Sequence, residues 1–145
     1  IGIAVPSFQA GLPSIRLRGA SASVAQLLQG ARNQMERTQT AVLLEVDPSR
    51  RWLGYRGSDG QRGEELELPS GVEIAAVAPP RLESIGDVAA VRREFLFLPG
   101  GSLPTIAVEL RNERGGIKRI WLNPVTTTPV VDDTPIERSP SAGRR

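Results

Sequence analysis

The sequence predicts an α+β domain in which one N-terminal helix packs on antiparallel β-sheets made of six or seven short strands. Three observations support this class. Apolar residues recur at the helical period in residues 14–38. The apolar period changes to two after Thr38, as in half-buried strands. Turn motifs rich in Gly and Pro then separate the short apolar runs.

The helix is expected over residues 14–38. Its apolar stripe follows the 3.6-residue period and consists of Val24, Leu27, Leu28, Ala31 and Met35. Polar side chains occupy the other angles, and the small residues 19–23 make the upstream half slender enough for another helix to approach closely. We expect the stripe itself to cover the core of its own domain.

The first strands are expected as a hairpin over residues 40–47 and 51–56, joined by the turn "DPSR". Pro48 presets the backbone angle of this turn, and the Asp47 carboxylate can accept a hydrogen bond from the backbone ahead. A Gly-rich loop follows. The remaining strands are expected in the stretches "EELELPSGVEIAAV", "REFLFL", "TIAVELRN" and "IKRIWLNPV". Residues 78–91 are irregular and could carry a short helical turn.

The C-terminal stretch "TTTPVVDDTPIERSPSAGRR" contains three prolines and few bulky apolar side chains. Such a segment buries too little surface to offset the entropy lost on ordering. We therefore expect a flexible tail over residues 132–145.

Composition argues against an enzyme. The 145 residues include no Cys and no His, which removes thiolate chemistry, thiolate zinc sites and the commonest general base. Adjacent Glu64 and Glu65 should point to opposite faces of a strand and so cannot converge as an acid–base pair. Asp132 and Asp133 could supply two oxygens to calcium, but nothing supplies the others. We expect no catalysis, metal, cofactor or small-molecule substrate.

The first residues, "IGIAVPSF", allow two interpretations. They could form an N-terminal strand or arm docked on the core of a complete domain. Alternatively, they are the downstream end of a longer apolar helix. The five residues before Pro6 are too few to span a bilayer, which takes about 20 residues.

Four stretches carry a resemblance to the H-type minor pseudopilins of bacterial type II secretion systems, within the type IV pilin superfamily. "IGIAVPSF" resembles the end of the pilin hydrophobic helix, and "LRGASASVAQLLQGARNQMERTQTAVLLEVDPSRRW" resembles the second helical half and first strand. "ELPSGVEI" is similar to the family's Leu-Pro-x-Gly-Val strand start. "FLFLPGGSLPTIAVEL" with "IKRIWLNPVTTTPVV" resembles its Phe-rich strand and terminal hairpin.

The resemblance implies a pilin-like fold with three parts. Residues 1–13 would be the remnant of a hydrophobic helix, 14–131 the globular pseudopilin domain and 132–145 a tail. The intact helix would anchor the subunit as a single pass in the bacterial inner membrane, with the globular domain in the periplasm. It would then pack against other minor and major pseudopilins in a short fibre that drives export of folded proteins. The expected assembly residues are Ile1, Ile3, Val5 and Phe8.

Two other functions stay open. A minor pilin of a type IV pilus, acting in pilus assembly or DNA uptake, would share this fold, and its basic C-terminal residues Arg138, Arg144 and Arg145 would contact DNA. The formal net charge of +2 does not demand an acidic partner, so nucleic acid is not expected in the leading interpretation. A hydrolase that uses carboxylates is the weakest alternative, because no convergent acid–base pair can be drawn.

Overall fold

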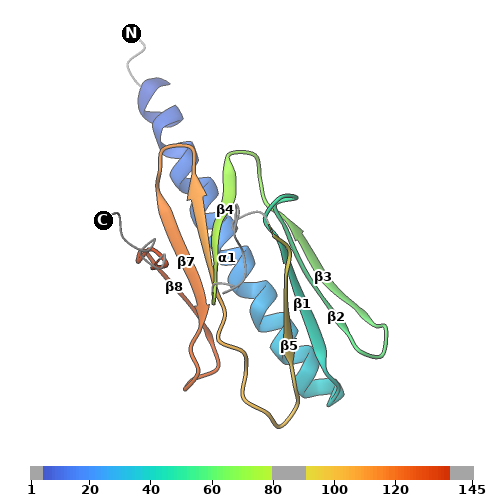
Figure 1. Ribbon diagram of the computed structural model, residues 1–145. Coiled ribbons are helices and arrows are strands. Elements are labelled where there is room, and N and C mark those ends of the chain that lie inside the picture. Colours follow the sequence, from blue (N-terminus) through green and yellow to red (C-terminus); the bar gives the residue numbers. More distant parts are fainter. Residues whose placement is uncertain (1–4, 80–90, 138–145) are drawn as a thin grey trace, which may run out of the picture.

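The computed structural model describes residues 5–79 and 91–137 of the chain. These residues form one long helix, α1 (Val5–Thr38), followed by eight strands (Figure 1). The strands are β1 (Val42–Asp47), β2 (Trp52–Gly57), β3 (Arg62–Glu67), β4 (Val72–Ala78), β5 (Arg93–Phe97), β6 (Ala107–Asn112), β7 (Ile117–Leu122) and β8 (Pro129–Asp132). The predicted α+β class is confirmed.

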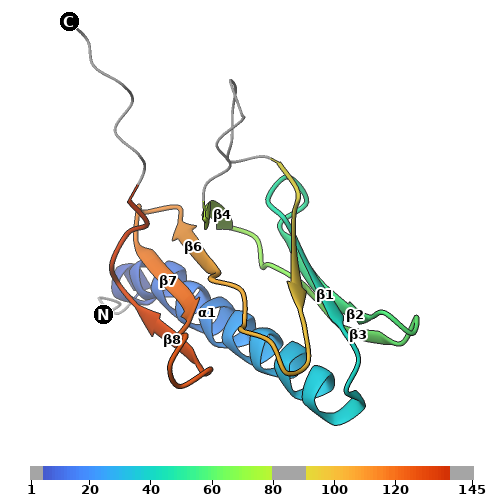
Figure 2. The same ribbon diagram turned by 60° about the horizontal axis from the view of Figure 1, so that its bottom comes forward.

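The strands form two four-stranded antiparallel sheets, in the orders β3-β2-β1-β5 and β4-β6-β7-β8. Both sheets contact α1, and they lie side by side along it (Figure 2). The first turns of the helix project past the ends of the strands (Figure 1). The described residues thus hold one strand more than the upper limit of seven that was expected.

The helix begins at Val5, earlier than the expected start at residue 14, and it crosses Pro13 without ending. Pro13 has no backbone N–H to donate to the carbonyl four residues earlier, so the helix lacks that one hydrogen bond. The helix ends at Thr38, and Gln39 takes a positive φ of 53° while its N–H bonds the Met35 carbonyl at 2.8 Å.

The core lies between α1 and the inner faces of both sheets. All five residues of the predicted helical stripe are buried. The alternation of apolar residues also correctly predicts which side of the strand faces the core, because Ile106, Val108 and Leu110 of the β6 region are all buried. Burying such side chains stabilises the fold by roughly 1.5–3 kcal/mol each.

The β1–β2 turn forms as the sequence predicts. The Asp47 carboxylate accepts hydrogen bonds from the Ser49 hydroxyl at 2.6 Å and from the Arg50 backbone N–H at 3.2 Å. The hydrogen bond from Ser49 holds the pKa of Asp47 below its usual range. The turn closes at Arg51, which adopts a positive φ of 52°.

The C-terminal segment continues the second sheet further than expected. Asp132 is the last residue of β8, and Asp133 forms an ion pair with Lys118 of β7. The backbone N–H of Ile136 donates to the Glu109 carboxylate at 2.8 Å. Flexibility of the tail stays a prediction, and residues 138–145 lie outside the described residues, as does most of the predicted helical turn in 78–91.

Candidate functional site

The N-terminal half of α1 exposes apolar residues between the exposed polar residues Ser14, Arg16 and Arg18. Leu12 is 43% exposed and Ile15 is 65% exposed, although both side chains are large and hydrophobic. Gly19 and Ala22 are also exposed, and a Cβ added at Gly19 would meet nothing within 4 Å. These four residues, spaced by three or four, form one stripe opposite the buried stripe. We call them the helix-face patch.

The same helix becomes polar toward its C-terminal end. Gln29 donates a side-chain hydrogen bond to Asn33 at 2.9 Å, and Arg32 pairs with Glu36 at 2.9 Å. These polar side chains are hydrogen-bonded or ion-paired with each other within the helix, and they face solvent. A partner that covers apolar surface would therefore bind at the N-terminal half of α1.

The structure places only part of the predicted assembly set. Val5 and Phe8 lie in the first turns of α1, whereas Ile1 and Ile3 lie outside the described residues. Sequence reasoning did not single out Leu12 and Ile15, which continue the same helix. Their signal was present, because both are large apolar residues that fall outside the buried stripe. The candidate DNA contacts at Arg138, Arg144 and Arg145 also lie outside the described residues.

The carboxylates do not converge. Glu64 and Glu65 line two different pockets on opposite faces of β3, as the strand alternation predicts. The Asp132 carboxylate is occupied by Arg119, which donates to its two oxygens at 2.9 and 2.5 Å, and by Trp121 at 2.9 Å. This Arg119 contact lowers the pKa of Asp132. Within residues 5–79 and 91–137, no cluster of acidic side chains is suited to a metal ion.

Trp52 and Tyr55 follow the basic pair Arg50 and Arg51 in the sequence, and aromatic residues beside arginines could stack a nucleic-acid base. The structure separates them. Tyr55 is buried against the helix, while Trp52 lies over Gly54 on the outer face of the same strand. Arg50 stacks on the Trp52 ring at 5.6 Å. Trp52 and Tyr55 therefore lie on opposite faces of β2, although both contribute to the lining of one hollow of about 210 Å³.

Two buried carboxylates were missed by the sequence reasoning. Glu45 of β1 pairs with Arg92 at 2.7 Å and with Arg56 at 3.3 Å, and the hydrogen bond with Glu45 raises the pKa of Arg92. Glu109 of β6 pairs with Arg111 at 3.5 Å and also binds the C-terminal segment. Glu45 is thus paired with arginines distant in sequence, whereas Glu109 is paired with Arg111 of its own strand and accepts a hydrogen bond from the Ile136 backbone.

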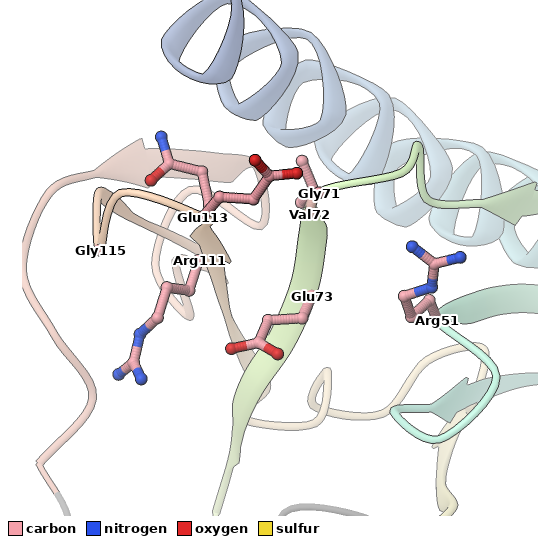
Figure 3. Close-up of a pocket in the computed structure, with 8 residues that line it drawn as sticks. Arg51, Gly71, Val72, Glu73, Arg111, Glu113 and Gly115 are labelled. Atoms are coloured by element: carbon pink, nitrogen blue, oxygen red, sulfur yellow. The ribbon is translucent and has the colours of Figure 1, made fainter.

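A shallow hollow of about 470 Å³ lies where the β1–β2 turn approaches β4 and the end of β6. Its lining contains both basic and acidic residues. Figure 3 shows Arg51 set apart from Arg111 and Glu113. Arg111 is already paired with Glu109. The hollow therefore lacks the convergent groups that catalysis needs.

No helix within the described ranges combines the length and apolarity needed to cross a membrane. No protein-family model and no curated protein sequence matches the chain significantly. The structure, however, is similar to that of the minor pseudopilin EpsH from the type 2 secretion system of Vibrio cholerae, with a TM-score of 0.58. The fold is that of a minor pseudopilin. The match covers 81% of this chain and 97% of EpsH at 11% sequence identity.

Proposed function

We propose that the chain is a structural minor subunit of a type II secretion pseudopilus. The EpsH-like fold supports this role, since it extends over nearly the whole of that minor pseudopilin. The observation that carries the proposal is the helix-face patch, in which Leu12 and Ile15 are exposed although both are large and apolar. A protein that assembles through its helix needs such a surface.

In this role α1 would pack against the N-terminal helices of other minor and major pseudopilins. Small residues at 19 and 22 would let a neighbouring helix approach, while Leu12 and Ile15 would supply the buried apolar contact. Residues 1–13 would belong to an N-terminal hydrophobic helix that anchors the subunit in the inner membrane before assembly. The globular domain would then lie in the periplasm, and the fibre would drive export of folded proteins.

Crosslinking through introduced cysteines tests the role directly, because the chain has no Cys of its own. Ile15→Cys is expressed in the full-length natural protein, together with pseudopilins that each carry one Cys in the N-terminal helix. We expect oxidation to link Ile15→Cys to a partner. Asn33→Cys, at an exposed polar position of the same helix, is the matched control. Equal crosslinking at both positions, or none at either, would refute assembly through the helix-face patch.

The DNA-binding pilin is tested separately. A DNA titration at several salt concentrations should show no binding near physiological salt if the chain is a secretion subunit. Affinity that falls steeply with salt and disappears on deletion of residues 134–145 would instead favour a type IV pilus minor pilin.

A further inference from the structure

Three turns of the sheets meet at one end of the molecule. The β1–β2, β3–β4 and β6–β7 turns all line the hollow of about 470 Å³, through Arg51, Gly71 and Gly115 (Figure 3). The β3–β4 turn also lies against the helix, because the Arg16 guanidinium donates a hydrogen bond to the Ser70 carbonyl at 3.5 Å. The first turns of α1 project beyond this end (Figure 1). A surface that surrounds the N-terminal part of α1 therefore also meets these turns.

Arginines outnumber the accessible acids at this end. Among residues 5–79 and 91–137, five arginines and three glutamates located there form no ion pair. These residues, which we call the basic end, are Arg16, Arg18, Arg50, Arg51 and Arg114 together with Glu67, Glu73 and Glu113. A further acid, Asp47, is only 8% exposed and is hydrogen-bonded within its own turn. The basic end thus attracts a surface with negative charge.

The helical segment that projects from the basic end carries no charge. From Val5 to Ile15 the helix has no acidic or basic side chain, and Arg16 and Arg18 follow at once. This segment spans about 16 Å of helix, close to half the thickness of the hydrocarbon core of a bilayer. Arginines directly after an uncharged helical segment are typical of the point where a helix leaves hydrocarbon and reaches the lipid headgroups.

We propose that the basic end docks on an anionic lipid surface, with its arginines against the headgroup phosphates and the uncharged segment of α1 in the bilayer. Arginine suits this contact because its planar guanidinium binds phosphate oxygens in pairs. DNA or an acidic peptide would match the arginines equally well, but it would leave the exposed Leu12 and Ile15 in water. The inference rests on the membrane-anchored helix of the proposed function, and it assigns a role to turns that lie outside the helix-face patch.

Vesicle sedimentation of the 145-residue chain tests the inference. The probes are vesicles of phosphatidylcholine alone and vesicles in which phosphatidylglycerol replaces part of it. We expect binding to the anionic vesicles that weakens as salt is raised, and binding to the neutral vesicles that is weaker by about tenfold or more. Equal binding to both kinds of vesicle, or no binding to either, would overturn the inference. Tighter binding to a DNA duplex than to the anionic vesicles would overturn it as well.

Charge variants locate the docking surface. The double variant Arg16→Gln with Arg18→Gln should weaken binding to anionic vesicles about 25-fold, and Arg114→Gln about fivefold, since each basic side chain near the surface contributes about fivefold. The matched control is Arg37→Gln with Arg62→Gln, which removes the same charge from two exposed arginines near the other end of α1. The control should weaken binding less than about twofold, because salt screens charges more than about 10 Å from the lipid. If the control weakens binding as much as the first double variant, net charge alone causes the binding and the basic end is excluded.

A paramagnetic lipid gives the orientation of the chain without any substitution. With a spin label on the headgroups of anionic bicelles, the amide signals of Gly71 and Gly115 should broaden. The signal of Gly60 should not, because the β2–β3 loop is joined to the far end of α1 by the hydrogen bond from the Ser58 N–H to the Ala41 carbonyl. Equal broadening at Gly60 would contradict the orientation. These experiments include no other pseudopilin, so they can fail while crosslinking through Ile15→Cys succeeds.

Discussion

Gly30 of α1 offers a sharp test of the contact between the helix and β2. In an exposed helix, replacing Gly with Ala stabilises the protein by about 0.8–1 kcal/mol. At Gly30 the new Cβ would lie 2.6 Å from the hydroxyl oxygen of Tyr55 and 3.3 Å from the ring carbons Cε1 and Cζ. The first distance is well inside the usual van der Waals separation of about 3.5 Å.

The gain in helix propensity and the steric overlap with Tyr55 oppose each other, and the overlap has the larger effect on stability. Overpacking a well-filled site costs about 1–3 kcal/mol. Gly30→Ala should therefore lower the free energy of unfolding by roughly 0–2 kcal/mol in the natural protein. In a Tyr55→Phe background the closest atom is absent, so the same change should be neutral or stabilising by up to about 1 kcal/mol. The double-mutant cycle should give a coupling energy of about 1–2 kcal/mol.

Urea unfolding followed by circular dichroism measures all four proteins of the cycle. Gly19→Ala is the control, because it is also a helical glycine and a Cβ there meets nothing within 4 Å. It should stabilise the chain by about 0.5–1 kcal/mol in either background. If Gly30→Ala stabilises the Tyr55 protein as much as Gly19→Ala does, the close approach of the Tyr55 hydroxyl to the helix is refuted.

Three further predictions concern the core and the second sheet. Leu28→Ala should lower the free energy of unfolding by about 3 kcal/mol, measured by urea titration, because Leu28 is completely buried. The Arg119 contact lowers the pKa of Asp132 from 3.8. The stability that this ion pair adds to the folded state is therefore complete above about pH 4 and is lost as the pH falls through the lowered pKa. Asp132→Asn should remove about 1 kcal/mol at pH 6 and flatten the acid limb of the stability profile; an unchanged profile would exclude this link. Glu109→Leu removes the acceptor oxygens and should speed hydrogen exchange at the Ile136 amide, and unaltered exchange would contradict the 2.8 Å hydrogen bond.

The sequence predicted the elements whose stability depends on apolar periodicity. The helical stripe of α1 and the alternation of β6 were correct because burial of these side chains fixes both the element and its orientation. The β1–β2 turn was also correct, since Pro48 and Asp47 determine its geometry locally. In each case the decisive residues lie within a few positions of one another.

β8 could not be predicted in this way. Its stretch "TTTPVVDD" is polar and contains Pro129, so its own pattern predicted no strand, and the tail was expected to begin at residue 132. The strand is stabilised by Asp132, which binds Arg119 and Trp121 of the preceding strand. Such pairs join residues more than ten positions apart, and no local pattern reveals them. The division into two sheets and the pairing of Glu45 with Arg92 depend on the same kind of distant contact.

The candidate assembly surface was predicted only in outline. The expectation that the N-terminal segment belongs to an apolar helix named residues up to Phe8, and the structure extends that helix face to Leu12 and Ile15. The basic end was not foreseen, because its arginines come from the helix and from two turns that only the fold brings together.

Because of how charge is distributed over the surface, a partner would bind the helix-face patch more favourably than the ion-paired faces of the sheets. The outer faces of both sheets carry ion pairs such as Glu45–Arg92 and Asp132–Arg119, and covering these pairs would remove their hydration without a new partner. Covering Leu12 and Ile15 removes apolar surface from water and gains roughly 25 cal/mol per Å². Leu96, Leu98 and Val125 are also large exposed hydrophobic residues. Burial without chemical complementarity is therefore favourable at the helix-face patch, but not there alone. In the proposed assembly, a second subunit that buries this patch would need only a matching apolar helix.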